Sequence, residues 1–289
     1  MPSSTTSLHT LSVQNPRFHI HPLFWTSYHT SIVNCTFQQV DNHDTNVYRS
    51  NPFDDTADDV KRLATDLGPR KKSVWVESMF RRPGSPITQM IQSPYFSYHK
   101  HIIQHTCTDL SVFCIKKEKV VDYDDPIIGY YRYNLSKERR QMLCPSRAPR
   151  DLTNNPVKRL YDIQFRRAVP KSWRQDPYLI CLIISMAQLH QRKGTVALSG
   201  DIQTRLLVTH ISDSTHAYVY KADIPHELLE CLDNPKRSMY DFSFPIIGWV
   251  KVPFVPYATF ADRLQSQLTG PSPTSLGPRG KKHKPDEME

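Results

Sequence analysis

Two histidines and a cysteine with metal-ligand chemistry lie close together in the sequence. His101 and His105 are four residues apart, so on a helix they would share one face, and Cys107 follows two residues later. Imidazole nitrogen and thiolate sulfur are ligands that zinc prefers. However, Lys100 would repel a cation, and no acidic residue stands between the histidines as in zinc proteases. The alternative is a partly exposed helix or strand in a chain with 13 histidines, and on that interpretation we expect no cofactor.

Two further groupings resemble parts of catalytic sites. Four aspartates between positions 54 and 59 resemble a doubled metal-binding motif, but acidic residues also favour the first turn of a helix. Asp213 and Lys221 resemble part of a nuclease core, which requires a carboxylate two residues before the lysine, where this chain has Val219. The chain has no Gly-rich phosphate loop and no Gly-x-Ser-x-Gly motif, which argues against nucleotide-hydrolysing folds.

Residues 132–174 hold the positive charge of the chain. They contain twelve basic and three acidic residues, an excess of nine that equals the net charge of the whole chain. Lysine and arginine beside aromatic rings suit an anionic partner such as nucleic acid, and a solvated helix face is the alternative. The candidate binding residues are Lys158, Arg159, Arg166, Arg167, Lys171, Trp173 and Arg174.

The clearest structural elements follow this basic stretch. Asp176 and Pro177 are typical of a helix start, and the residues up to Leu189 are apolar nearly all the way round, which predicts a helix covered on both sides. Strands are predicted over 204–211 and 216–224, followed by a short helix and a last strand over 242–252. This helix-strand-strand-helix-strand module predicts an α+β fold, with a small antiparallel sheet and helices on one face.

Composition divides the chain into four regions. We expect a poorly ordered N-terminal segment over 1–52 and a mixed α/β region over 53–150 that could belong to the same domain as the module. The compact α+β module covers 151–262, and a disordered tail covers 263–289. Both ends are thus expected to be disordered.

The sequence predicts an intracellular protein of the cytoplasm or nucleus. The N-terminus lacks a basic start followed by an apolar run. The most apolar stretch, Tyr178 to Leu189, is about 12 residues long, whereas a membrane span needs roughly 20, so we expect no membrane association. The six cysteines are expected to be reduced thiols.

Several short segments of the module resemble a known family. They are Asp-Pro-Tyr-Leu-Ile-Cys-Leu from position 176, Leu-Leu-Val-Thr-His from 206, Tyr-Val-Tyr-Lys-Ala-Asp-Ile-Pro from 218 and Leu-Asp-Asn-Pro from 232. Together they resemble an uncharacterised family of filamentous-fungal (ascomycete) proteins over roughly residues 170–252. The resemblance implies no activity.

The absence of an assembled nucleophile, base and orienting group favours a non-enzymatic interaction protein with a protein partner. A nucleic-acid-associated protein that uses residues 132–174 is the alternative. A metal-dependent enzyme that uses the cluster over 99–107 is the third hypothesis. The oligomeric state stays open.

Overall fold

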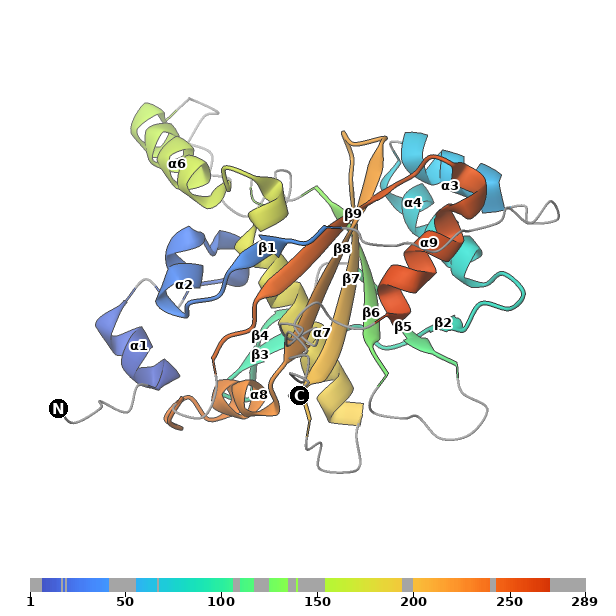
Figure 1. Ribbon diagram of the computed structural model, residues 1–289. Helices are drawn as coiled ribbons and strands as arrows, with labels where there is room; N and C mark the ends of the chain where they lie inside the picture. Colours follow the sequence, from blue (N-terminus) through green and yellow to red (C-terminus); the bar gives the residue numbers. More distant parts are fainter. Residues whose placement is uncertain are drawn as a thin grey trace, which may run out of the picture.

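A seven-stranded mixed sheet organises the computed structural model (Figure 1). Its strands, in chain order, are β1 (Phe37–Gln39), β2 (Ile87–Gln89), β5 (Leu110–Ile115), β6 (Ile127–Tyr133), β7 (Ile202–His210), β8 (His216–Ile224) and β9 (Ile247–Pro253). The structure describes residues 7–16, 18, 20–41, 56–66, 68–105, 110–116, 125–134, 139, 154–193, 200–239 and 243–270.

The strand order in the sheet is β1-β9-β8-β7-β6-β5-β2. β1 pairs with β9 in parallel and β6 pairs with β7 in parallel, whereas the other neighbours are antiparallel. β3 (Tyr95–Tyr98) and β4 (His101–His105) form a separate two-stranded sheet. The parallel β6–β7 pair requires a crossover connection, which is long in this chain and contains α6 (Asn155–Ala168) and α7 (Pro177–Lys193).

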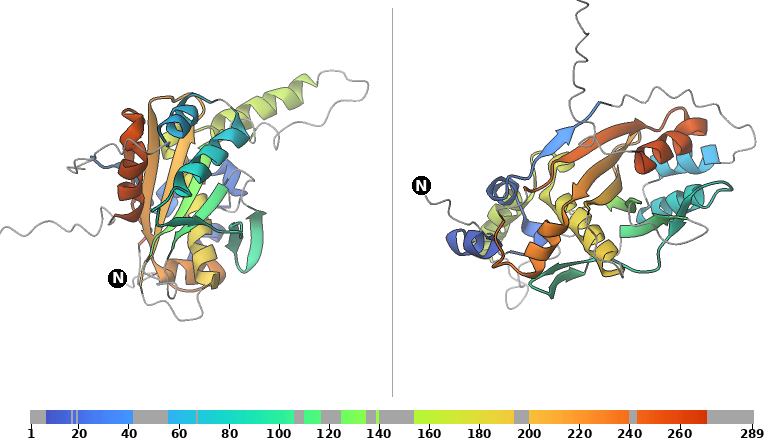
Figure 2. Two further views of the ribbon diagram at one scale, coloured as in Figure 1. Left: turned by 90° about the vertical axis from the view of Figure 1, so that its right-hand side faces the viewer. Right: turned by 60° about the horizontal axis from the view of Figure 1, so that its bottom comes forward.

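Helices cover both faces of the sheet (Figure 2). One face packs against α7, with α1 (Leu8–Gln14), the 3-10 turn η1 (Pro22–Phe24), α2 (Ser27–Ile32) and α8 (His226–Asp233) around it. The other face packs against α3 (Thr56–Thr65), α4 (Pro69–Phe80) and α9 (Tyr257–Thr269). The molecule therefore has three layers.

The alternation of side chains along the central strands explains these layers. In β8, Tyr218 and Tyr220 belong to the core beneath α7, whereas Val219 belongs to the core beneath α9. A strand that is buried on both faces needs a nearly continuous apolar run, as β8 has. In β6, Gly129 lets α7 lie close to the sheet, because a Cβ atom there would be 2.5 Å from Sδ of Met186.

The predicted mixture of helices and strands is confirmed, but the predicted sheet is wrong in two respects. The sheet is large and contains two parallel pairings, so it is not a small antiparallel sheet. Helices pack on both faces and not on one, because the β-strands bury both sets of alternating side chains. The prediction treated each strand as a local element, whereas β1 and β6 pair with β9 and β7 over long sequence separations.

The strands of the sheet come from most of the chain. β2, β5 and β6, from the predicted region 53–150, join the same sheet as β7, β8 and β9 of the predicted module. α1, α2 and β1 lie within the segment expected to be poorly ordered, and α9 continues to Thr269 in the expected tail. Among the described helices, none combines the length and apolarity needed to cross a membrane.

Candidate interaction site: the α6 arm and its base

The basic stretch predicted from the sequence is divided between the interior and the surface. Arg132 and Arg139 are buried, with 5% and 1% of their surfaces exposed, and Arg174 is half-buried. Much of the stretch between Arg139 and α6 lies outside the described residues. The exposed cations lie on α6 or just after it: Lys158, Arg159, Arg166, Arg167 and Lys171. The charge of the stretch is therefore only partly a surface property.

Helix α6 has local signals at both ends. The side chain of Asn154 accepts a hydrogen bond from the backbone N–H of Val157 at 3.3 Å, and a proline occupies the first turn. Arg166 and Arg167 stand in the last turn, where the helix dipole favours positive charge. These interactions favour a helix that does not depend on extensive packing against the rest of the molecule.

One side of α6 is apolar. Val157, Tyr161 and Phe165 recur at four-residue spacing, and the rings of Tyr161 and Phe165 are stacked with centroids 6.0 Å apart. Leu160 borders this side and is 61% exposed, whereas Ile163 lies on the far side of the helix and is 43% exposed. Of the residues of α6, all of which are described, the last alone is buried. Figure 1 shows the helix projecting away from the three layers, so it presents apolar surface to solvent.

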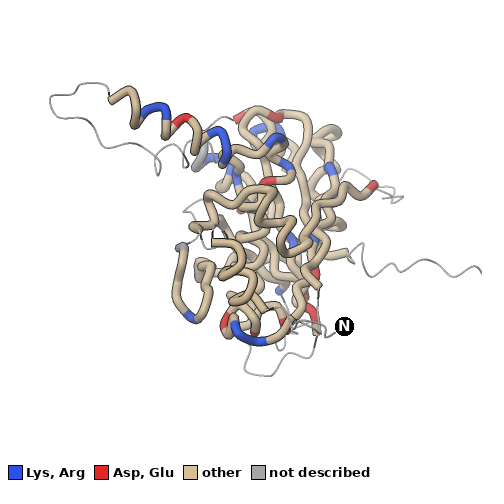
Figure 3. The backbone as a smooth tube through the Cα atoms, turned by 90° about the vertical axis from the view of Figure 1, so that its left-hand side faces the viewer, with Lys and Arg blue, Asp and Glu red and all other residues tan. Residues whose placement is uncertain are grey.

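The opposite side of α6 is basic. Helical spacing places Arg159 and Arg166 there together with Asp162, and places Lys158 at the border, beside Phe165. Nε of Arg166 donates to the backbone oxygen of Asp162 at 3.3 Å. Figure 3 shows these cations along the projecting helix. A basic amphipathic helix is typical of a segment that docks on a partner. We call α6 and the chain up to Gln175 the α6 arm.

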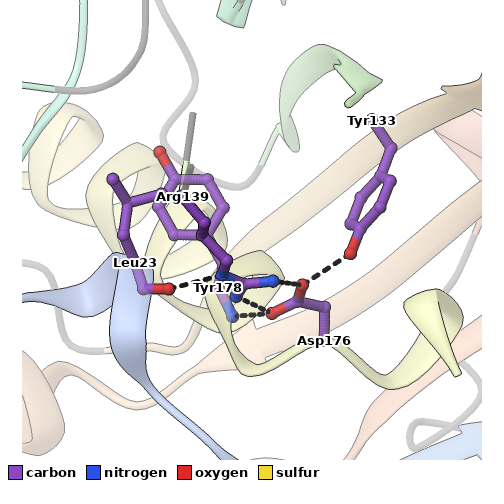
Figure 4. Close-up of polar contacts among 5 residues, drawn as sticks. All are labelled: Leu23, Tyr133, Arg139, Asp176 and Tyr178. Carbon is purple, nitrogen blue, oxygen red and sulfur yellow. Dashed lines mark hydrogen bonds and ion pairs between the residues drawn. The ribbon is translucent and has the colours of Figure 1, made fainter. Parts of the chain in front are cut away.

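A buried ion pair joins the two ends of the chain segment that carries this arm, from Arg139 to Asp176 (Figure 4). Arg139, which follows β6, donates from Nη1 and Nη2 to the two carboxylate oxygens of Asp176 at 2.7 and 2.8 Å. Asp176 directly precedes α7, and the two side chains are 1% and 0% exposed. Because the partners are 37 positions apart in the sequence, the pair closes the base of the arm. We call it the Arg139–Asp176 clamp.

The other polar atoms of the clamp are also paired. Nε of Arg139 donates to the carbonyl of Leu23 at 2.6 Å, and the hydroxyl of Tyr133 donates to Asp176 at 2.6 Å. Asp176 also accepts the backbone N–H of Tyr178 at 2.9 Å, so it caps α7 as predicted. This matters because a buried ion pair stabilises a fold only when its remaining polar groups are satisfied.

Arg139 and Tyr133, the two side chains that donate to Asp176, both stay protonated. Burial alone would lower the pKa of Arg139, but the hydrogen bonds and charge of Asp176 raise it above its ordinary value. Burial, together with the negative charge of Asp176, raises the pKa of Tyr133 far above its ordinary value. Both groups therefore remain donors throughout the neutral pH range.

Two of the predicted binding residues belong to the base of the arm and not to α6. The ring of Trp173 stacks on His210 with centroids 4.8 Å apart and meets Tyr218 edge-on at 4.8 Å. The guanidinium of Arg174 lies 5.0 Å from the centre of the Tyr218 ring and donates to its hydroxyl at 2.8 Å. Tyr218 in turn donates to Asp213 at 2.6 Å. Trp173 and Arg174 are thus engaged in packing the arm against the sheet.

The histidine cluster is not on a helix. His101 and His105 are the first and last residues of β4, and successive strand residues rise by about 3.3 Å, which separates them by roughly 13 Å. His99 and Lys100 have positive φ values of 52° and 62° and form the tight turn between β3 and β4. The shared helical face predicted for the two histidines is therefore wrong.

Cys107 lies outside the described residues. Within the described ranges, no group of three or more His, Cys, Asp or Glu side chains is arranged to hold a metal ion. The metal-dependent enzyme stays a hypothesis.

The residues of the other two groupings singled out in the sequence lie in turns, strands and helix starts where they are described. Asp213 accepts hydrogen bonds from the backbone N–H groups of Thr215 and His216 at 2.9 and 3.1 Å, so it shapes the turn between β7 and β8. Lys221 is buried within β8, five residues beyond His216. Asp58 and Asp59 stand in the first turn of α3, and the other two aspartates of that group lie outside the described residues.

The clamp was not predicted as a pair. The sequence marked Asp176 as a helix cap, but Arg139 was one cation among twelve and carried no signal of burial. Tyr133 also had no feature that set it apart in the sequence. Their roles depend on the parallel pairing of β6 with β7, which places Tyr133 opposite His210 at one end of the sheet.

Comparison with known proteins adds no relative: no family model, no curated protein and no solved structure matches this chain. The resemblance to a filamentous-fungal family over residues 170–252 therefore stays a prediction.

Proposed function

We propose that this chain is a non-enzymatic interaction protein that docks on a protein partner through α6. The observation that carries the proposal is the exposure of an amphipathic helix: α6 projects from the layers, buries one residue and leaves Leu160 61% exposed. Soluble proteins usually bury such a face, and an apolar surface left outside commonly marks an interaction site.

The chemistry of α6 favours a groove with an apolar floor and an acidic rim. Leu160 and Ile163 supply exposed apolar anchors three residues apart, and Ile163 lies between Arg159 and Arg167 on the helix surface. Amphipathic helices bind in this way, with anchors at three- and four-residue spacing. The cations would then contribute mainly to the association rate and to the choice of partner.

The clamp supports this role because it fixes the base of the arm. Arg139 holds Asp176 in place, and the described chain from the end of α6 leads directly to Asp176, so the C-terminal end of α6 is attached at a defined position on the molecule. A binding element held in this way loses less conformational entropy on association than one on a free linker.

Nucleic acid is the second candidate, because four cations are exposed on one short helix. Two observations favour a protein instead. Trp173 and Arg174, the expected stacking and phosphate-binding residues, are engaged at the base of the arm. In addition, exposed Leu160 and Ile163 have no role in binding phosphates.

The proposal is tested by photo-crosslinking in living cells that produce the protein. A photoreactive amino acid is placed at Leu160 on α6 or at Val74 on α4, two positions with 61% and 55% exposure. We expect one defined protein to crosslink from position 160 and not from position 74. The captured protein is then purified and its affinity is measured directly.

A salt titration with labelled single- and double-stranded DNA and RNA separates the two candidates. Nucleic-acid binding that persists near physiological salt and is weakened by Arg166→Ala and Arg167→Ala would support the second candidate. Equal crosslinking from positions 160 and 74 would count against any docking role of α6.

A further inference from the structure

An apolar cavity lies on the α7 face of the molecule, between α7 and the N-terminal helices. Its volume is about 210 Å³, and its walls are mostly aliphatic and aromatic. Ile180 and Ile184 of α7 form one wall, and Trp25, Phe96 and Leu232 face them from other elements. Engineered apolar cavities of about 150 Å³ stay free of water and bind benzene. This cavity is larger, and by the same measure it has room for roughly eight carbon atoms.

The polar side chains in the walls are neutral. Nδ1 of His21 accepts the backbone N–H of Leu23 at 3.3 Å, and Nδ1 of His29 accepts that of Thr26 at 3.0 Å. An acceptor at Nδ1 places the ring proton on Nε2. Burial also lowers the pKa of His21, which keeps this ring uncharged at neutral pH. The chamber therefore favours an uncharged, apolar occupant.

The cavity adjoins a groove that contains a cation. The groove lies between α2 and α6, and Ile20 and His29 line both spaces. Ile20 and Ile103, which also lines the cavity, are 37% and 39% exposed, so the chamber is accessible from solvent. Arg167 of α6 lines the groove and is exposed. The apolar cavity thus adjoins a groove whose lining includes one arginine.

We infer that the apolar cavity and the adjoining groove bind a carboxylate with an aliphatic chain of about eight carbon atoms. The chain occupies the cavity between Ile184 and Phe96, and the carboxylate lies in the groove near Arg167. Removal of the chain from water provides the affinity, and Arg167 selects an anionic head group. The aliphatic chain does not depend on the partner proposed for α6, because it contacts α7 and the elements around the cavity, whereas the head group shares Arg167 with α6.

Calorimetric titration of the full chain with hexanoate, octanoate and dodecanoate tests the cavity. Each buried methylene is worth about fourfold in affinity, so octanoate should bind about 15-fold more tightly than hexanoate. The gain should cease beyond about eight carbons, where the cavity is full. Absence of octanoate binding at millimolar concentration, or an affinity that keeps rising through dodecanoate, would overturn the inference.

Cavity-filling variants locate the site. Ile184→Phe places extra atoms in the chamber and should weaken octanoate binding at least tenfold while the protein still unfolds cooperatively. Ile180→Phe fills the same space and serves if the first variant does not fold. Val74→Phe, on the opposite face, is the matched control and should bind as the unchanged protein does. Equal binding by a folded cavity-filling variant would contradict the site.

The head group is tested separately. Arg167→Gln should weaken octanoate about two- to fivefold, as expected for an exposed ion pair, and should leave 1-octanol binding unchanged. Lys171→Gln removes an exposed cation outside the groove and should change neither. Octyltrimethylammonium should bind more weakly than octanoate. Equal binding of these two amphiphiles would overturn the role of Arg167.

Discussion

The two helices of the crossover between β6 and β7 have opposite relations to the rest of the molecule. α7 has 17 residues and buries thirteen in succession, from Pro177 to Leu189. α6 has 14 residues and buries one. The difference follows from composition, because α7 is apolar on all sides and must be enclosed, whereas α6 has a basic side that must remain in water. One connection thus contains both the centre of the fold and a helix that is almost entirely unburied.

Asp176 of the Arg139–Asp176 clamp lies between these two helices in the chain and is fully buried. Breaking the clamp should therefore have the largest effect on stability. Arg139→Ala leaves the Asp176 carboxylate buried without its cation and should lower the free energy of unfolding by about 3–5 kcal/mol. Urea denaturation measures this loss. Arg166→Ala, which removes an exposed arginine of α6, is the matched control and should change stability by less than about 0.5 kcal/mol. Comparable losses in both variants would show that the clamp is not structural.

The apolar centre of α7 gives the next effect. Leu182 and Ile183 are 0% exposed, and truncation of either to alanine should cost about 2–5 kcal/mol because each leaves a cavity. The free energies come from denaturant melts monitored by circular dichroism. A neutral result at both positions would mean that α7 is not the centre of the fold.

A smaller and pH-dependent effect should arise at the base of the arm. Burial, together with the nearby cations Arg174 and Lys72, lowers the pKa of His210 below 6.5, although Asp213 opposes this shift. The unfolded chain then binds more protons than the folded chain, so stability is lost as pH falls below about 6.5 and levels off below the folded pKa. Protonation would also oppose the hydrogen bond that Nδ1 of His210 accepts from the backbone N–H of Ser212.

His210→Phe isolates this contribution, because phenylalanine preserves a ring beside Trp173 and does not titrate. Thermal melts between pH 7.5 and about 5 should show a smaller loss of stability in this variant than in the unchanged protein. Identical pH profiles would show that His210 is not responsible. His21 has a pKa lowered by burial and remains in both proteins, so it does not affect the comparison.

Local patterns predicted α7 and the β7–β8 hairpin well. The Asp-Pro start and the long apolar run of α7 are strong signals, and β8 has the bounds 216–224 that the sequence predicted. The last strand begins at Ile247, after Pro245, so its predicted start at 242 was too early. A proline has no N–H for the strand ladder, which explains the later start.

The layers and the clamp depend on contacts that local patterns do not contain. Ile127 pairs with Thr204, far along the chain, and this parallel register builds the large sheet. Arg139 meets Asp176 only because that register brings the end of β6 to the start of α7. The basic stretch looked uniform in sequence, although burial separates Arg139 from the exposed cations of α6. Sequence composition showed the charge but not which side chains reach the surface.

The most direct test of the docking role of α6 is the affinity of the captured partner for the Leu160→Gln variant. The substitution removes an exposed apolar anchor from α6, so binding should weaken at least tenfold, as for a central interface residue, while the free energy of unfolding changes by less than about 0.5 kcal/mol. Val74→Gln, at similar exposure on α4, should leave both quantities unchanged. Unchanged partner affinity in Leu160→Gln would contradict the docking role of α6, and a large loss of stability would show that this face packs against the molecule itself.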